Sequence, residues 1–290
     1  MPEEEGGEAL IHVAIEAEEL FAIGPLSFTN SMVGALLATT VLLLGAWYIS
    51  RRSALVPGRL QSALELPIEL LAGIVSASSS RWRSYVAVIL ALFLMILVAN
   101  WIGLLPGVGT IGITHVDEAG HEAMVPIVRP ASADLNFTLG LAIIAFVMFV
   151  YWGIKAHGGW GYLKELLGQP TYMAPLMFPI NIISELSRLI SLSMRLFGNI
   201  FAGEVLLATM LALTTAAVFV LPLAFFVPAV FLGLELLFGL VQALVFALLA
   251  MTYISVAIAE NQAAGHGDDH GEADTPHADR HSPAAEAASA

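Results

Sequence analysis

The length of its uncharged runs constrains this chain more than any other feature. Residues 31–50 form a run of 20 residues without a charged side chain, and residues 174–260 form an apolar stretch of 87 residues that is broken near Leu221 and Pro222. A 20-residue helix is about 30 Å long, which matches the hydrocarbon core of a bilayer. Charged residues make up 12% of the chain, against about 25% in soluble domains. The lipid bilayer is therefore the expected solvent for most of this chain.

The apolar runs predict an all-α polytopic membrane protein. Three of them fit upright transmembrane helices, over residues 31–50, 84–105 and 135–154. Residues 60–78 repeat apolar and polar side chains at helical spacing, which is typical of an amphipathic helix in the membrane interface. The segments 174–218 and 223–260 would each form a helix about 60 Å long, twice the bilayer thickness. We therefore expect a hairpin of two long, strongly tilted membrane helices that a protein partner holds in place.

The positive charges predict the orientation in the membrane. The segment 1–30 is acidic, and five of the eleven Lys and Arg residues follow the first span, at Arg51, Arg52, Arg59, Arg81 and Arg83. Cytoplasmic loops carry the excess of Lys and Arg, so we expect the N-terminus outside and the C-terminus in the cytoplasm. Residues 155–170 are predicted to be a Gly-rich cytoplasmic connection.

The tail 261–290 lacks apolar periodicity and is expected to be disordered. It contains four histidines that could bind a metal, namely His266, His270, His277 and His281. Without ordered surroundings, a solvated tail accounts for them better than a metal site does, so no metal is predicted.

Composition and motifs exclude several classes of function. The net charge of −13 argues against a nucleic-acid-binding protein. Because the sequence has no cysteine, disulfides, thiol catalysis and Cys-ligated metal centres are excluded. It has no Gly-rich phosphate-binding loop of the Lys-Ser/Thr kind, so we expect no ATP chemistry on this chain, and no cofactor is predicted.

Five charged side chains lie well inside the last two apolar segments. They are Glu185, Arg188, Arg195, Glu204 and Glu235. Each charge at membrane depth costs about 2.5 to 3.5 kcal/mol on insertion scales, so such residues indicate function by default. For Arg195 two structural roles stay open as alternatives. Its side chain could extend to the membrane interface, or it could pair with Glu185 or Glu204 to hold the fold together.

The helical positions around Arg195 predict a face that another helix can approach. Ser187, Ser191, Arg195, Asn199 and Gly203 recur every four residues, and Arg188 points in nearly the same direction as Arg195. Apart from the arginines, this face is small and polar, which permits close helix contact. A tightly packed pair of helices within this chain would produce the same pattern.

Glu204 and Glu235 are predicted to face each other across the hairpin. Glu204 lies about 180° around the helix from Arg195 and about 13 Å further along it, so these two should not pair directly. The two glutamates are 17 and 14 residues from the break at Leu221 and Pro222, which brings them level. Two carboxyl groups in register within lipid could share a proton or line a proton path. A hydrogen-bonded pair that only holds the helices together is the structural alternative.

The residues around Arg195 resemble a known family. The segment 191–204 reads SLSMRLFGNIFAGE and is similar to the signature of subunit a of the F-type ATP synthase membrane sector. Further blocks in the same order extend the likeness over nearly the whole chain before the tail. They are Ile23-Gly24-Pro25 with Thr29-Asn30-Ser31, Val56-Pro57-Gly58 with Gln61 and Glu65, Asn100 with Leu104-Leu105-Pro106, Arg129-Pro130 with Ala133-Asp134-Leu135-Asn136, and Gln242-Ala243.

The resemblance implies a stator protein of the bacterial plasma (inner) membrane that provides two offset proton half-channels. Its partners would be a rotating ring of c subunits, b-type peripheral stalk subunits, the remaining ATP synthase subunits and the lipid bilayer. The ion path would couple proton translocation to rotation of the ring.

The resemblance also implies roles for individual residues. Arg195 matches the family's essential arginine, which faces a carboxylate on the rotor, and Gln242 matches its neighbour on the last helix. The other matches are Glu204, Asn199 and Glu235 for proton access, Asp134 with Asn136 for the outer funnel, and Ser191, Arg188 and Glu185 in support. Many relatives carry a His at one of the two positions held here by Glu204 and Glu235. Which of these two relays a proton stays open, as do proton against sodium coupling, ring size and direction of operation.

Two other classes compete with this interpretation. A secondary transporter for a small solute would also place charges at mid-membrane, but such folds usually show inverted repeats and paired broken helices, and we find neither by inspection. A purely structural membrane scaffold would not need a deep arginine. Copurification with an oligomeric proteolipid ring would favour the stator, whereas solute binding by the isolated chain would favour the transporter.

Overall fold

The structure, a computed structural model, describes residues 17–24, 26–52, 58–78, 82–105, 108, 111–116, 122–168, 171–216 and 221–264. Within these residues it contains six α-helices: α1 (Asn30–Arg52), α2 (Arg59–Ser78), α3 (Val86–Gly103), α4 (Leu135–Leu167), α5 (Ala174–Ala216) and α6 (Leu221–Ala264). Two antiparallel hairpins pair β1 (Glu19–Ile23) with β2 (Leu26–Thr29) and β3 (Gly112–Val116) with β4 (Glu122–Pro126). Short 3-10 helices are η1 (Trp82–Ser84), η2 (Ala131–Ala133) and η3 (Thr171–Met173).

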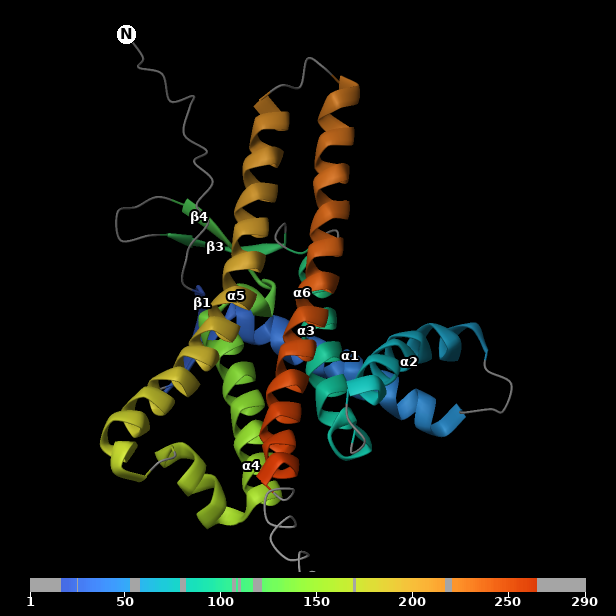
Figure 1. Ribbon diagram of the computed structural model, residues 1–290. Helices are drawn as coiled ribbons and strands as arrows, with labels where there is room; N and C mark the ends of the chain where they lie inside the picture. Colours follow the sequence, from blue (N-terminus) through green and yellow to red (C-terminus); the bar gives the residue numbers. More distant parts are fainter. Residues whose placement is uncertain are drawn as a thin grey trace, which may run out of the picture.

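Four helices form the packed centre of the molecule. α6 packs against α3, α4 and α5, and α4 also packs along α5. In Figure 1 α5 and α6 run side by side as a long hairpin, and the first part of α5 bends away from α6. α1 packs on α3 and runs across the direction of the hairpin. Because the two directions cross, a bilayer in which α1 stands upright contains the hairpin at a strong tilt.

Small side chains on one face of α6 permit this packing. Ala243, Phe246, Ala247, Ala250 and Ile254 recur at three- and four-residue steps and are all buried. Alanines at a contact let two helix backbones approach closely, which is a usual basis of helix association in membranes. Neighbouring segments supply larger core side chains, among them Tyr85, Ile89, Phe93, Leu192 and Leu196.

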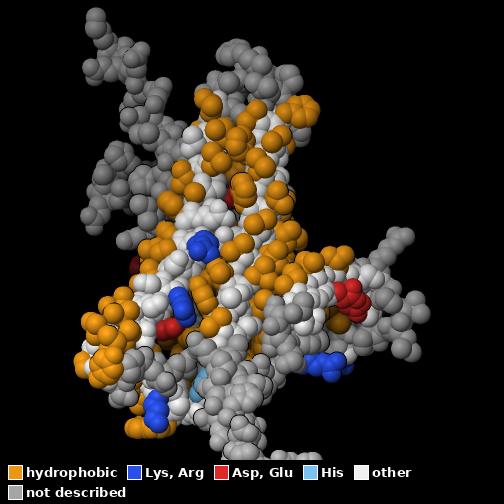
Figure 2. Space-filling view, in the orientation of Figure 1, with side chains coloured by type: hydrophobic (Ala, Val, Ile, Leu, Met, Phe, Trp, Pro, Cys, Tyr) orange, Lys and Arg blue, Asp and Glu red, His pale blue; other side chains and the backbone are white. Residues whose placement is uncertain are grey.

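The outer surfaces of the helices are apolar. Five helices, namely α1 and α3 to α6, are long and apolar enough to cross a membrane. Large hydrophobic side chains stay exposed along them, and hydrophobic side chains predominate on the face that Figure 2 shows. An exposed apolar surface of this extent needs lipid or a protein partner as cover. The predicted fold class, an all-α polytopic membrane protein, is thus confirmed.

Most helix boundaries agree with the predicted ones, and α4 differs most. The predicted span 135–154 continues as helix to Leu167, with a break at Gly158, where φ is 73°. Glycine adopts this left-handed conformation without steric cost, so the chain changes direction there and a second helical part begins. The expected Gly-rich connection is therefore largely helical.

The interfacial helix predicted over residues 60–78 is α2, and its Leu71 and Val75 are buried. The hairpin segments predicted at 174–218 and 223–260 are α5 and α6. The sequence does not predict the two β-hairpins, because strands of four or five residues in polar segments leave no clear alternating pattern. Residues 1–16 and 265–290, including the four tail histidines, lie outside the described residues.

Candidate functional site

A polar face of α5 is left uncovered by the rest of the described chain. Its exposed members are Ser187, Ser191, Arg195 and Asn199, and Gly203 at the end of the row is partly buried. The neighbouring apolar side chains Ile190 and Met194 are about half exposed. A tightly packed pair of helices within the chain would bury this face, so that interpretation of the pattern is wrong.

The side chain of Arg195 forms no hydrogen bond or ion pair with any residue that the structure describes. The two carboxylates considered as its structural partners pair with other arginines: Glu185 with Arg188 and Glu204 with Arg129. Arg195 is thus a cation whose charge no neighbour in the described part of the chain neutralises.

Glu204 is bound on both carboxylate oxygens by Arg129. Nε of Arg129 donates to Oε1 at 3.0 Å and to Oε2 at 3.2 Å, and Nη2 donates to Oε2 at 2.9 Å. The Arg129 side chain is only 4% exposed. A guanidinium that holds a carboxylate through two nitrogens forms the strong, geometrically specific kind of ion pair. Glu204 therefore has a counter-charge that is fixed in place.

The loop that carries Arg129 is held between α1 and α3. A Cβ atom on Gly34 of α1 would overlap the carbonyl oxygen of Arg129, and one on Gly103 of α3 would overlap the ring of Pro130. The 3-10 helix η2, which follows at once, is buried. Arg129 is absent from the predicted site residues, because 75 residues separate it from Glu204 and no local spacing joins them. The sequence feature that could have identified Arg129 is its position in the Arg129-Pro130 block, which is one of the blocks that resemble the family.

Glu235 of α6 lies against α5 beside Glu204. It is 7% exposed, and a Cβ atom on Gly203 would come within 2.8 Å of its Oε1. The charge of Glu204 acts on Glu235 electrostatically. Oε2 of Glu235 has no hydrogen-bond partner among the described residues. The structure thus brings the two glutamates together across the hairpin, at the register that the sequence predicts.

Other buried polar atoms follow Glu235 along α6. Gln242, seven residues later, is 7% exposed, and its Nε2 has no partner within the described ranges. Asn100 of α3 donates through Nδ2 to the carbonyl of Gly239 at 3.4 Å, while its Oδ1 is also without a partner there. Buried polar atoms are costly unless water or another molecule satisfies them. The partnerless atoms of Gln242 and Asn100 are therefore suited to bind water between α3 and α6.

Asp134 joins the starts of α1 and α4. Its Oδ1 accepts the backbone N–H of Asn136 at 2.8 Å, and its Oδ2 accepts the hydroxyl of Ser31 at 2.5 Å. The first bond caps α4, since the first turn of a helix has free N–H groups. The side chain of Asn136 is exposed next to it. Further along α4, the hydroxyls of Thr138 and Ser193 meet at 3.2 Å and connect α4 to α5.

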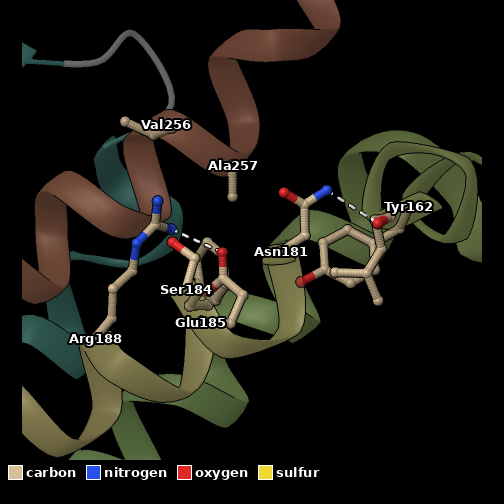
Figure 3. Close-up of a pocket in the computed structure, with 9 residues that line it drawn as sticks. Tyr162, Asn181, Ser184, Glu185, Arg188, Val256 and Ala257 are labelled. Atoms are coloured by element: carbon tan, nitrogen blue, oxygen red, sulfur yellow. Dashed lines mark hydrogen bonds and ion pairs between the residues drawn. The ribbon is translucent and has the colours of Figure 1, made fainter. Parts of the chain in front are cut away.

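A cavity of about 210 Å³ lies between α4, α5 and α6, toward the end of α6. Figure 3 shows Tyr162 of α4 and Asn181 and Arg188 of α5 around it, with α6 along one side. Nη1 of Arg188 lies 2.8 Å from Oε1 of Glu185, and its guanidinium lies over the ring of Tyr253 at 5.4 Å. The cavity is therefore lined by polar and charged groups that can bind water.

Arg195 lies between two polar regions along α5. Arg188 at the cavity precedes it by seven residues and Glu204 follows it by nine, which corresponds to about 10 and 13 Å along the helix. One region is a cavity lined by polar and charged groups, and the other holds two carboxyl groups and buried polar atoms that have no partner among the described residues. A carboxyl group on a neighbouring molecule could exchange a proton on either side of the fixed cation.

Comparisons with known proteins agree on one family. Residues 32–255 match the family described as ATP synthase A chain. The chain is similar to ATP synthase subunit a of Aliarcobacter butzleri, with 37% identity over 77% of this chain and 88% of the relative. It is 36% identical to ATP synthase subunit a of Gluconobacter oxydans over 81% and 90% of the two chains. The subunit of Gloeobacter violaceus is 32% identical over 91% and 96%.

Proposed function

Because the chain belongs to the family of ATP synthase subunit a, we propose that Arg195 is the fixed positive gate between two offset proton half-channels of an F-type ATP synthase. The chain is a multi-pass bacterial membrane protein with the proton-channel role of that family. In the finer proposal it is the stator, past which a ring of c subunits turns. Each c subunit would bring one carboxyl group to Arg195.

The chemistry of arginine suits this gate. Its guanidinium stays protonated under all physiological conditions, so it attracts an ionised carboxylate and never accepts the proton. A protonated carboxyl group arriving from one side has to release its proton before it can bind beside Arg195. It takes up another proton only after it has moved past, from the half-channel on the other side. Protons then cross the membrane only when the ring turns.

We assign the two half-channels to the two polar regions on either side of Arg195. The outer one contains the predicted residues Asp134, Asn136, Asn199, Glu204, Glu235 and Gln242. The inner one contains the cavity beside Glu185 and Arg188, with Ser191 between it and the gate. In this assignment the N-terminus is outside and the C-terminus is cytoplasmic. Each elementary charge that crosses yields about 2.3 kcal/mol per 100 mV, which the ring converts to torque.

The observation that carries the proposal is the environment of Arg195. It is exposed, it has no partner in the described part of the chain, and it lies between the two polar regions of α5. A deep cation without a partner in its own chain is expensive in lipid, and an acid on a neighbouring rotor removes that cost. The b-type peripheral stalk and the remaining subunits would hold the stator against the ring.

A secondary transporter for a small solute is the second candidate, and the helices do not favour it. Transporter sites are typically built from discontinuous helices whose ends point at the solute. α5 and α6 are continuous through Arg195 and Glu235. A site formed by broken helices is therefore not present at these positions.

The test is the Arg195→Ala variant of the assembled ATP synthase in membrane vesicles. We expect ATP-driven acidification and proton-driven ATP synthesis to be lost, because nothing then forces the rotor carboxyl group to release its proton. Passive proton leak should rise, as measured by decay of an imposed pH gradient. Thr209→Ala, an exposed position further along α5, is the matched control with normal pumping. Normal assembly with undiminished ATP synthesis in Arg195→Ala would refute the gate.

A further inference from the structure

Both lysines of the chain, Lys155 and Lys164, lie in the last part of α4. Residues 135–154 of the same helix contain no charged side chain, so Lys155 is the first charge that α4 carries. The left-handed backbone at Gly158 then breaks the helix, and in Figure 1 its second part turns away from the first part and leads toward α5. A lysine at the end of an apolar helix extends its ammonium group to the membrane surface. This end of α4 therefore suits the level of the lipid headgroups.

One face of the second part of α4 packs on the rest of the chain. Tyr162 and Leu166 line the cavity between α4, α5 and α6, and Nδ2 of Asn181 donates to the carbonyl of Leu166 at 3.0 Å. The ring of Tyr162 also lies close to the first part of α4, since a Cβ atom on Gly153 would come within 2.7 Å of it. The second part of α4 is thus fixed against helices that span the membrane and is not a free loop.

The opposite face is exposed. Trp160, Leu163 and Lys164 lie three and four residues apart, so they share one side of the helix. Trp160 is 71% exposed, and Tyr172 of η3, which follows the helix, is 79% exposed. In Figure 2 hydrophobic side chains gather at the lower left, over this part of α4 and the start of α5, beside a positively charged side chain. Exposed Trp and Tyr are typical of the membrane–water interface, because their rings are apolar and their tips are polar.

The charges of the two lysines are available to an anion from outside the chain. Both side chains are exposed, and neither forms an ion pair with a residue that the structure describes. The ammonium of Lys155 lies 4.5 Å from the ring centre of Trp152 and 5.9 Å from that of Tyr151. The faces of these rings attract the ammonium but do not neutralise its charge. The apolar surface at the end of α4 therefore carries two positive charges.

We propose that the surface formed by Lys155, Trp160, Leu163 and Lys164 binds the headgroups of anionic phospholipids. Trp160 and Leu163 insert between the acyl chains, and the two ammonium groups bind lipid phosphates. Any lipid could cover the apolar side chains, but each lysine favours an anionic membrane surface. In the orientation proposed above this is the cytoplasmic leaflet, whose surface potential is negative. The inference goes beyond the proposed function and does not depend on the gate at Arg195.

The test identifies the neighbour of this surface by photocross-linking in the whole ATP synthase. A photoreactive residue is introduced as Leu163→benzoylphenylalanine, and the enzyme is reconstituted in phosphatidylcholine with a minor share of phosphatidylglycerol. After illumination, mass spectrometry identifies the lipids attached to subunit a. We expect the ratio of phosphatidylglycerol to phosphatidylcholine in the adducts to exceed the bulk ratio by at least about fivefold, the scale of one lysine at a charged surface.

Leu36→benzoylphenylalanine is the matched control. Leu36 is 59% exposed on α1 and lies far from the arginines at the end of that helix. The probe at this position should attach to lipid at the bulk ratio.

Substitutions at the two lysines separate charge from packing. With the probe at position 163, Lys164→Gln should lower the enrichment, and Lys155→Gln/Lys164→Gln should return the ratio to the bulk value. Lys155→Arg/Lys164→Arg should keep the enrichment, because arginine also binds phosphate. The amount of assembled enzyme is measured for every variant, so that adducts are compared at equal assembly.

The proposal is overturned if the probe at position 163 attaches to protein, whether a stalk subunit or the tail of this chain, or if its lipid adducts keep the bulk ratio. Enrichment that persists in Lys155→Gln/Lys164→Gln would also overturn it, since charge would then not select the lipid. None of these measurements uses pumping. Their outcome is therefore distinct from that of Arg195→Ala, which tests the gate.

Discussion

Arg129 and Arg195 are chemically identical, and their surroundings give them opposite roles. The guanidinium of Arg129 is buried and bound to Glu204, whereas that of Arg195 is exposed and has no partner in the described ranges. A cation that already holds a carboxylate cannot attract a second one with the same strength. Of these two arginines, Arg195 is therefore the one whose charge is available for a group that arrives from another molecule.

At Arg195 even a conservative replacement is expected to fail. In Arg195→Lys the ammonium can lose its proton in a low-dielectric contact, and it lacks the planar fork that binds a carboxylate at two points. We expect coupled ATP synthesis to fall by roughly a hundredfold, the scale of losing one preorganised charged group. The measurement is proton-driven ATP synthesis at equal amounts of assembled enzyme. Synthesis within a few-fold of the unmodified enzyme would show that charge alone is sufficient.

Sequence reasoning reaches some of these residues and not others. Helical spacing is enough to place Arg195 with Ser191 and Asn199, because one helix fixes their relative positions. Counting from the hairpin break is enough to place Glu204 level with Glu235. The Arg129–Glu204 pair depends on how a loop lies on α1 and α3, and no periodicity within one segment contains that information.

Among the elements, the long helices are the most predictable, because a helix in lipid must satisfy its backbone internally and its apolar length is plain in the sequence. α5 begins at residue 174, as predicted, and α2 begins one residue before its predicted start. The second part of α4 is not predicted, because Lys155, His157 and several glycines in this segment are typical of a loop between helices. The β-hairpins are not predicted either, because strands of four or five residues are too short to show a clear alternating pattern.

The contact of α1 with the Arg129 loop gives a prediction about one glycine. In Gly34→Ala the new methyl group would overlap the Arg129 carbonyl oxygen, so the loop or the helix has to shift. Such overpacking costs about 1 to 3 kcal/mol. We expect a lower melting temperature of the purified membrane sector and slower pumping.

Gly45→Ala is the matched control on the same helix. Nothing lies within 4 Å of a Cβ atom there, and alanine favours helix over glycine by up to about 1 kcal/mol. We expect unchanged or slightly higher thermal stability in this variant. Equal behaviour of the two alanine variants would mean that the Arg129 loop is not seated on Gly34 in the assembled enzyme.

At the scale of the whole molecule, the described helices expose many large hydrophobic side chains, and α5 places an exposed cation among small polar residues far from either of its ends. Lipid suffices as cover for the exposed leucines of α1. The Ser191, Arg195 and Asn199 face needs a partner that brings a polar or acidic group to membrane depth. The stator proposal therefore predicts that the ring contacts this face and not α1.

Introduced cysteines can test this surface directly, because the sequence has none of its own. Ser191→Cys should cross-link to a cysteine placed beside the rotor carboxyl group, under mild oxidation of membranes. Thr40→Cys, at an exposed position of α1, should not. The products are detected by size on a denaturing gel and should disappear on reduction. Cross-linking at Thr40 with none at Ser191 would place the ring on the wrong side of the molecule for this mechanism.

The seating of the Arg129 loop on α1 and α3 also has a mechanical consequence for a stator. In the proposed motor, a ring that turned against α5 would push that helix sideways. The ion pair to Glu204 ties α5 to the loop, and through it this load would pass into α1 and α3. The seating of this loop on Gly34 and Gly103 would then decide how stiffly the channel is held while the motor is under torque.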